Sequence, residues 1–172
     1  MNVIAVDPGM ANTGIVYASE LSVICFKTIS GKPVYTDQYE LLERQACIAR
    51  QILAWIADKP HEAVILEGFV NFHGRQNGYT FQTPQLIGYL QDRFEQAGEN
   101  LVMQTSDKVL NPRAKGSVVS YEDSVNGRNL AKQNALKRSG WRGVENLPND
   151  HTRAAMLHAC YYYLHKEDAW ER

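Results

Sequence analysis

The first eighteen residues constrain the fold most strongly. An apolar run at 3–6 ends in the carboxylate of Asp7, a Pro-Gly turn follows, and a second apolar run begins near Thr13. Short apolar runs separated by turn residues are typical of β-strands. Aspartate is disfavoured inside strands, so Asp7 at a strand end is not explained by packing. With a glycine that allows close approach beside it, Asp7 indicates a site for a metal ion or a phosphate.

Strand and helix patterns alternate along the rest of the chain. Residues 3–6, 13–18 and 21–26 are typical of three consecutive strands, and a helical spacing of apolar residues covers 40–57. Residues 62–67 are expected to form a strand, and the apolar run at 63–66 has no polar alternation, as expected of a strand buried on both faces. The remaining expected elements are a loop at 68–82, a helix from an N-cap at Thr83 to about 97, a strand at 101–104, an irregular stretch at 105–127, and helices at 128–138 and 150–165. This order predicts one α/β domain over residues 1–172, a mixed five-stranded sheet flanked by helices.

Composition excludes several classes of protein. The chain has 172 residues, of which 44% are hydrophobic and 22% charged, as in ordinary globular proteins with a buried core. It shows no signal peptide and no apolar stretch of membrane length. We therefore expect a soluble, cytoplasmic protein without a membrane partner.

Positive charge is concentrated in one segment. Residues 108–143 contain two acidic residues and eight basic ones, which are Lys108, Arg113, Lys115, Arg128, Lys132, Lys137, Arg138 and Arg142. A local surplus of this kind is typical of a surface that binds a polyanion. A solvated basic loop and helix face would give the same pattern.

Two acids occupy equivalent places at strand ends. Asp7 ends the first strand and Glu67 ends the apolar strand at 62–67. If the two strands are parallel neighbours, both carboxylates emerge at one edge of the sheet, where ligand sites lie in α/β proteins. Close carboxylates repel unless a cation joins them, and Mg²⁺ prefers oxygen ligands. Taken alone, Glu67 is equally explained as an acid that faces water.

The last helix brings further candidates in its first turn. Asp150 and His151 open this helix, and the small side chains of Ala154, Ala155 and Ala159 would let it lie close to the sheet. Asp150 is also explained as a residue that caps the helix and complements its dipole.

Three ordered motifs resemble those of the RuvC-type Holliday junction resolvases, above all their bacteriophage relatives, within the RNase H-like superfamily. The motifs are Asp-Pro-Gly-x4-Gly from Asp7, the strand Ala-Val-Ile-Leu-Glu that ends at Glu67, and Asp-His-x-Arg-x-Ala from Asp150. The resemblance implies an RNase H-like fold, a homodimer, and a Mg²⁺-dependent endonuclease in which Mn²⁺ can substitute. Its implied substrate is branched DNA, especially four-way junctions cut by paired symmetric nicks. A phage-encoded chain would act in the host cytoplasm.

The resemblance also implies the catalytic, metal-binding residues. Asp7 corresponds to the family's first-strand acid, Glu67 to its central-strand acid, and His151 to the upstream ligand of the last helix. The downstream acid is expected at residue 154, where this chain has Ala154. Either Asp150 takes over as a ligand, or one ligand has been removed. A shifted alignment, with Asp150 upstream and Arg153 downstream, also leaves the last acid missing.

DNA contacts are expected outside the acid cluster, because phosphate contacts by Lys and Arg supply most DNA affinity. Aromatic side chains in the loop after Glu67 could stack on bases opened at a junction. The expected contact residues are Arg75, Lys108, Arg113, Lys115, Arg128, Lys132, Lys137 and Arg138, with Phe72 and Tyr79 for stacking.

Three other functions are compatible with the motifs. The first turn also resembles the phosphate loop of actin-like ATPases, but 172 residues cannot hold the two domains that those enzymes need. Ala154 favours a junction-binding protein without activity. A related nuclease acting on other branched DNA or on RNA–DNA hybrids would have the same motifs.

Overall fold

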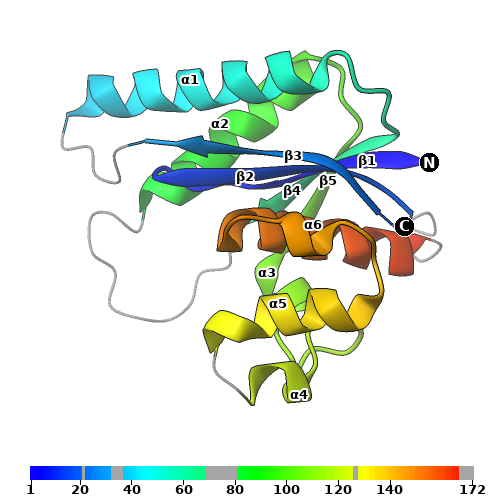
Figure 1. Cartoon of the computed structure of the whole chain (residues 1–172). Coiled ribbons are helices and arrows are strands. Elements are labelled where there is room, and N and C mark those ends of the chain that lie inside the picture. The colour runs from blue at the N-terminus through cyan, green and yellow to red at the C-terminus, as the bar shows by residue number, and fades with distance from the viewer. Residues whose placement is uncertain (21, 32–36, 69–80, 126–127, 167–172) are drawn as a thin grey trace.

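A five-stranded sheet lies between two layers of helices in the computed structural model (Figure 1). The structure describes residues 1–20, 22–31, 37–68, 81–125 and 128–166. In chain order, the elements are β1 (Asn2–Asp7), β2 (Asn12–Ser19), β3 (Ser22–Ser30), α1 (Gln38–Ile56), β4 (Ala63–Gly68), α2 (Gln82–Gln96), β5 (Leu101–Thr105), α3 (Ser106–Leu110), α4 (Tyr121–Ser124), α5 (Arg128–Ser139), the 3-10 turn η2 (Val144–Asn146) and α6 (Asp150–Leu164).

The sheet is mixed, with strand order β3-β2-β1-β4-β5. Strands β1, β2 and β3 form an antiparallel meander, whereas β1, β4 and β5 are parallel. The central strands β1 and β4 are buried over most of their length because both of their faces are covered. The predicted fold class is confirmed.

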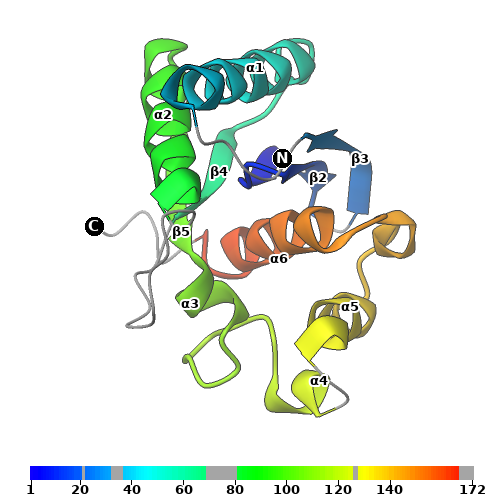
Figure 2. The ribbon, with the colours of Figure 1, turned by 90° about the vertical axis from the view of Figure 1, so that its left-hand side faces the viewer.

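Strand alternation divides the core into two apolar clusters. Ile4, Val6 and Leu66 point toward α1 and α2, while Ala5 and Ile65 belong to the cluster under α6. Helix α6 lies directly against β1 and β2, and α3 and α5 lie on its outer side (Figure 2). A residue that follows Val6 or Leu66 in its strand therefore points toward α6.

Two of the expectations are wrong in detail. Helix α2 begins at Gln82, so Thr83 is inside the helix and Phe81 holds the cap position without a side-chain bond. Pro84 fits in the first turn because backbone N–H groups there have no partner within the helix. The stretch at 105–127 is not irregular throughout, since it contains α3 and α4. These helices are too short for a visible apolar period.

Most of the predicted loop at 68–82 lies outside the described residues, which resume at Phe81. Among the described helices, none is both long and apolar enough to cross a membrane.

Candidate active site

Asp7 and Glu67 lie side by side at the carboxyl edge of the sheet. Parallel β1 and β4 pair Val6 with Leu66, so the next residue of each strand points toward α6 at the same level. The two carboxyl groups are hydrogen-bonded to each other. The predicted acid pair is therefore present in the structure.

The environment separates the pKa values of the two acids. Burial raises the pKa of Asp7 to about 6, with a further contribution from the charge of Glu67, although the hydrogen bond with His151 opposes the shift. Burial also acts to raise the pKa of Glu67, but the contact with His158, the hydrogen bond with Asp7 and the charge of Lys132 hold it below its ordinary value. The pKa values of the two acids are therefore pushed apart, with that of Asp7 raised and that of Glu67 lowered.

His151 reaches the acid pair from the first turn of α6. Its Nδ1 lies 2.9 Å from Oδ2 of Asp7. This hydrogen bond raises the pKa of His151, and burial opposes the rise. The structure thus brings together three of the four predicted catalytic residues, which are Asp7, Glu67 and His151.

The N-terminus of α6 is fixed by contacts that sequence reasoning missed. Asn149, not Asp150, caps the helix, and it forms a capping box with Thr152. Its side-chain amide also donates to Oγ1 of Thr28 on β3, at 2.8 Å. Gly14 of β2 lies so close to His151 and Thr152 that a Cβ on it would overlap the helix backbone. These contacts set the height of His151 above Asp7.

Asp150 and Ala154 have separate surroundings. Asp150 has a half-exposed side chain and forms an ion pair with Arg153, with Oδ1 3.1 Å from Nη1. This pair lies outside the contacts that join Asp7, Glu67 and His151. Ala154 is buried, and among the described residues it belongs to neither apolar cluster. Its methyl group offers no donor atom.

A second histidine of α6, His158, contacts the other acid. Its Nε2 lies 3.2 Å from Oε2 of Glu67, and its Nδ1 lies 3.1 Å from Oε1 of Gln104. His158 is fully buried, and Gln104 on β5 is the register partner of Glu67. Sequence reasoning missed both residues. The seven-residue spacing from His151, which puts the two histidines on one helix face, is the signal that could have revealed His158.

The basic segment borders this edge of the sheet. Lys132 of α5 is close enough for its charge to lower the pKa of both Glu67 and His151. The largest single influence is burial, which raises the pKa, for Glu67, and the hydrogen bond with Asp7, which also raises it, for His151. Lys132 and Arg113 line a cavity of about 690 Å³ between the α3–α4 segment and α5. The side chains of Lys108, Arg113, Lys115 and Lys137 are exposed.

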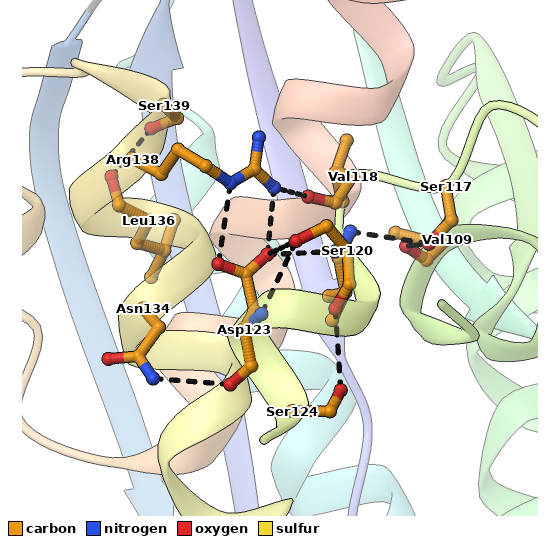
Figure 3. A network of polar contacts seen from close by, with 11 residues as sticks. Val109, Ser117, Val118, Ser120, Asp123, Ser124, Asn134, Leu136, Arg138 and Ser139 are labelled. Carbon is orange, nitrogen blue, oxygen red and sulfur yellow. Dashed lines mark hydrogen bonds and ion pairs between the residues drawn. The ribbon is translucent and has the colours of Figure 1, made fainter. Parts of the chain in front are cut away.

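Arg138 makes contacts within the chain. Its guanidinium donates to both carboxylate oxygens of Asp123, at 3.3 and 2.8 Å, and to the carbonyl oxygen of Val118, at 2.9 Å (Figure 3). Ser120 also donates to Asp123 from its backbone and its hydroxyl. Arg138 therefore ties α5 to α4. Arg75, Phe72, Tyr79 and the side chain of Arg128 lie outside the described residues.

The donor set fits a divalent cation. Among the described residues, no three His, Cys, Asp or Glu side chains already converge as a formed metal site. Oε2 of Glu67 and Nε2 of His158, however, are buried without a hydrogen-bond partner in the described chain. Buried atoms of this kind call for a cation or a proton. Carboxylate oxygens and imidazole nitrogen are ligands for Mg²⁺ or Mn²⁺.

Asp7→Asn is expected to stabilise the metal-free protein near neutral pH. The pKa of Asp7 rises from 3.8 to about 6 on folding, so its contribution to stability is present below 3.8 and is lost as pH rises through 6. Above pH 6 the buried carboxylate costs at most about 3 kcal/mol. Urea unfolding in EDTA should show Asp7→Asn gaining stability at neutral pH and little below the ordinary aspartate pKa. An equal effect at both pH values would contradict the pKa shift.

Comparison with solved structures gives extensive matches. Thermus thermophilus RuvC in complex with Holliday junction substrate matches with a TM-score of 0.68 and 18% identity, over 98% of this chain and 96% of that one. A second structure of Thermus thermophilus RuvC gives a TM-score of 0.63 at 18% identity, over 98% and 97%. The yeast mitochondrial Holliday junction resolvase Ydc2 gives 0.59 at 13% identity, over 94% and 77%. No family model and no curated protein sequence matches the chain.

The sheet order and the helical layers define an RNase H-like fold. RuvC is matched in complex with Holliday junction substrate, and Ydc2 is a Holliday junction resolvase. The resemblance predicted from the sequence motifs is confirmed at the level of the fold. More narrowly, this is the fold of RuvC and Ydc2.

Proposed function

We propose that the chain is a Mg²⁺-dependent endonuclease that resolves four-way DNA junctions by paired symmetric nicks. The observation that carries the proposal is the pair Asp7–Glu67 at the sheet edge, contacted by His151, in a chain with the fold of RuvC. Burying two neighbouring carboxyl groups costs free energy because their charges repel. Binding of a cation between them offsets this cost.

Each residue of the site has a distinct role in this proposal. Asp7 and Glu67 would hold the metal, and His151 would bind it or orient Asp7. When bound, Mg²⁺ supplies activation of water and stabilisation of the leaving 3′ oxygen. Thr13 keeps Asp7 in place, because its hydroxyl donates to the Gly9 carbonyl at 2.9 Å and so fixes the turn that follows.

DNA would approach over the basic segment. Lys132 is close enough to Glu67 and His151 for its charge to lower their pKa values. Exposed Lys108, Arg113, Lys115 and Lys137 belong to the segment from α3 to α5, which lies on the same side of the sheet as α6 (Figure 1). Contacts with phosphates by such residues would hold the substrate without fixing its sequence. Two nicks on opposite strands need two active sites, so we propose a homodimer.

The test compares this chain with its Ala154→Asp variant on a mobile four-way junction and on duplex DNA. We expect both proteins to bind the junction more tightly than the duplex in Ca²⁺. In Mg²⁺ both should cut it, and Ala154→Asp should need less Mg²⁺ because an added carboxylate strengthens the metal site. Binding is measured by fluorescence anisotropy, and cleavage on strand-labelled junctions.

The other outcomes separate the alternatives. If only Ala154→Asp cuts, the chain is a ligand-deleted, junction-binding protein. Cleavage of other branched DNA but not of four-way junctions would support a related nuclease. If neither protein prefers the junction to the duplex, the proposal fails.

A further inference from the structure

We propose that His158 is a metal ligand of this site and supplies, through Nε2, the donor that Ala154 lacks. The inference rests on the proposed metal-dependent function and deepens it. His158 lies one helical turn after residue 154, the position at which the resemblance places an acid.

The hydrogen bond with Gln104 fixes the state of the His158 ring. Oε1 of Gln104 can only accept, so Nδ1 of His158, 3.1 Å away, carries the proton of this bond. In a neutral ring, Nε2 then holds a lone pair. Histidines that bind metals are held in the same way, with one nitrogen donating to a carbonyl and the other free for the ion.

The free nitrogen faces Glu67. Nε2 lies 3.2 Å from Oε2 of Glu67, and neither atom has a hydrogen-bond partner among the described residues. Two buried acceptors at this distance repel each other unless a cation lies between them. A divalent ion placed between Nε2 and Oε2 would remove this repulsion and would gain both atoms as ligands.

The fold places this contact within the acid cluster. Glu67 and Gln104 are register partners on β4 and β5, and both side chains point toward α6. His151 and His158 lie two turns apart on one helix face, so one histidine contacts each acid. Ala154 lies between them on α6. The four side chains form a row from His151 through Asp7 and Glu67 to His158.

Mn²⁺ bound to the chain without DNA provides a test that does not depend on cleavage. Electron spin echo envelope modulation detects ¹⁴N of an imidazole directly bound to Mn²⁺. We expect this coupling in His151→Ala and its loss in His151→Ala/His158→Gln. The Mn²⁺ dissociation constant, measured by titration, should rise by roughly 100-fold or more on loss of His158, because loss of an outer partner alone costs 10- to 100-fold.

Paired variants distinguish ligation from packing. Gln104→Met removes the acceptor at similar volume and should weaken Mn²⁺ binding roughly tenfold, whereas Gln104→Glu keeps the acceptor and should retain it. Ala154→Asp in the His151→Ala/His158→Gln chain should restore affinity without the nitrogen coupling. Circular dichroism and thermal unfolding confirm that each variant is folded.

Two negative results have different meanings. If Mn²⁺ binds in a manner that requires Asp7, but the ¹⁴N coupling of His151→Ala is absent or survives loss of His158, His158 is not a ligand and the acid site stands. If Asp7→Asn leaves Mn²⁺ binding unchanged, the metal site of the proposed function fails, and this inference fails with it.

Discussion

Gly14→Ala is expected to destabilise the chain by roughly 3 kcal/mol or more and to abolish metal binding at the acid pair. A Cβ on Gly14 would lie 2.5 Å from both the carbonyl oxygen of His151 and the amide nitrogen of Thr152. These are backbone atoms, so no rotamer change relieves the overlap, and the effect lies at the upper end of overpacking costs. Helix α6 must move away from β2, which separates His151 from Asp7.

Gly88→Ala is the matched control. Gly88 is exposed within α2, and a Cβ there would meet nothing within 4 Å. The same substitution should therefore stabilise the protein by about 0.5–1 kcal/mol, because alanine is the better helix former. Urea unfolding measures both variants. If Gly14→Ala unfolds at the same urea concentration as the parent chain, the close approach of α6 to β2 is wrong.

The acid pair could be predicted because its signal is local. An acid that ends an apolar run marks the end of a strand, and Asp7 and Glu67 needed only parallel neighbouring strands to meet. His151 is predicted through the resemblance instead, because a histidine in the first turn of a helix is by itself more often structural.

His158 and Gln104 could not be predicted because their significance depends on pairing across the sheet. Gln104 looks like any polar residue in a short strand until the β4–β5 register places it beside Glu67. Within α6, His158 stands among residues of both apolar and aromatic character, where a buried histidine is ordinarily structural. Likewise, Asn149 is the cap in place of Asp150 because it alone reaches both Thr152 and Thr28.

Glu67→Gln is expected to reduce junction cleavage in Mg²⁺ at least roughly hundredfold, while junction affinity in Ca²⁺ changes only severalfold. The substitution keeps the shape of the side chain but removes the negative charge that, in the proposed function, would hold the cation between β4 and α6. Loss of an outer partner of a metal ligand already costs 10- to 100-fold, and loss of a direct ligand should cost more. Junction affinity should persist because it comes mainly from Lys and Arg contacts with phosphates.

Glu62→Gln provides the control at the opposite end of the same strand. Glu62 directly precedes β4 and pairs with Lys166, 3.1 Å away, so the same chemical change is made far from the carboxyl edge of the sheet. Its loss should cost at most about 1 kcal/mol of stability and leave the cleavage rate unaltered. Single-turnover cleavage and anisotropy titrations on one junction compare both variants with the parent chain. Equal losses in the two variants would mean that Glu67 acts through folding, whereas a loss confined to Glu67→Gln assigns the chemistry to the carboxyl edge where β1 and β4 meet α6.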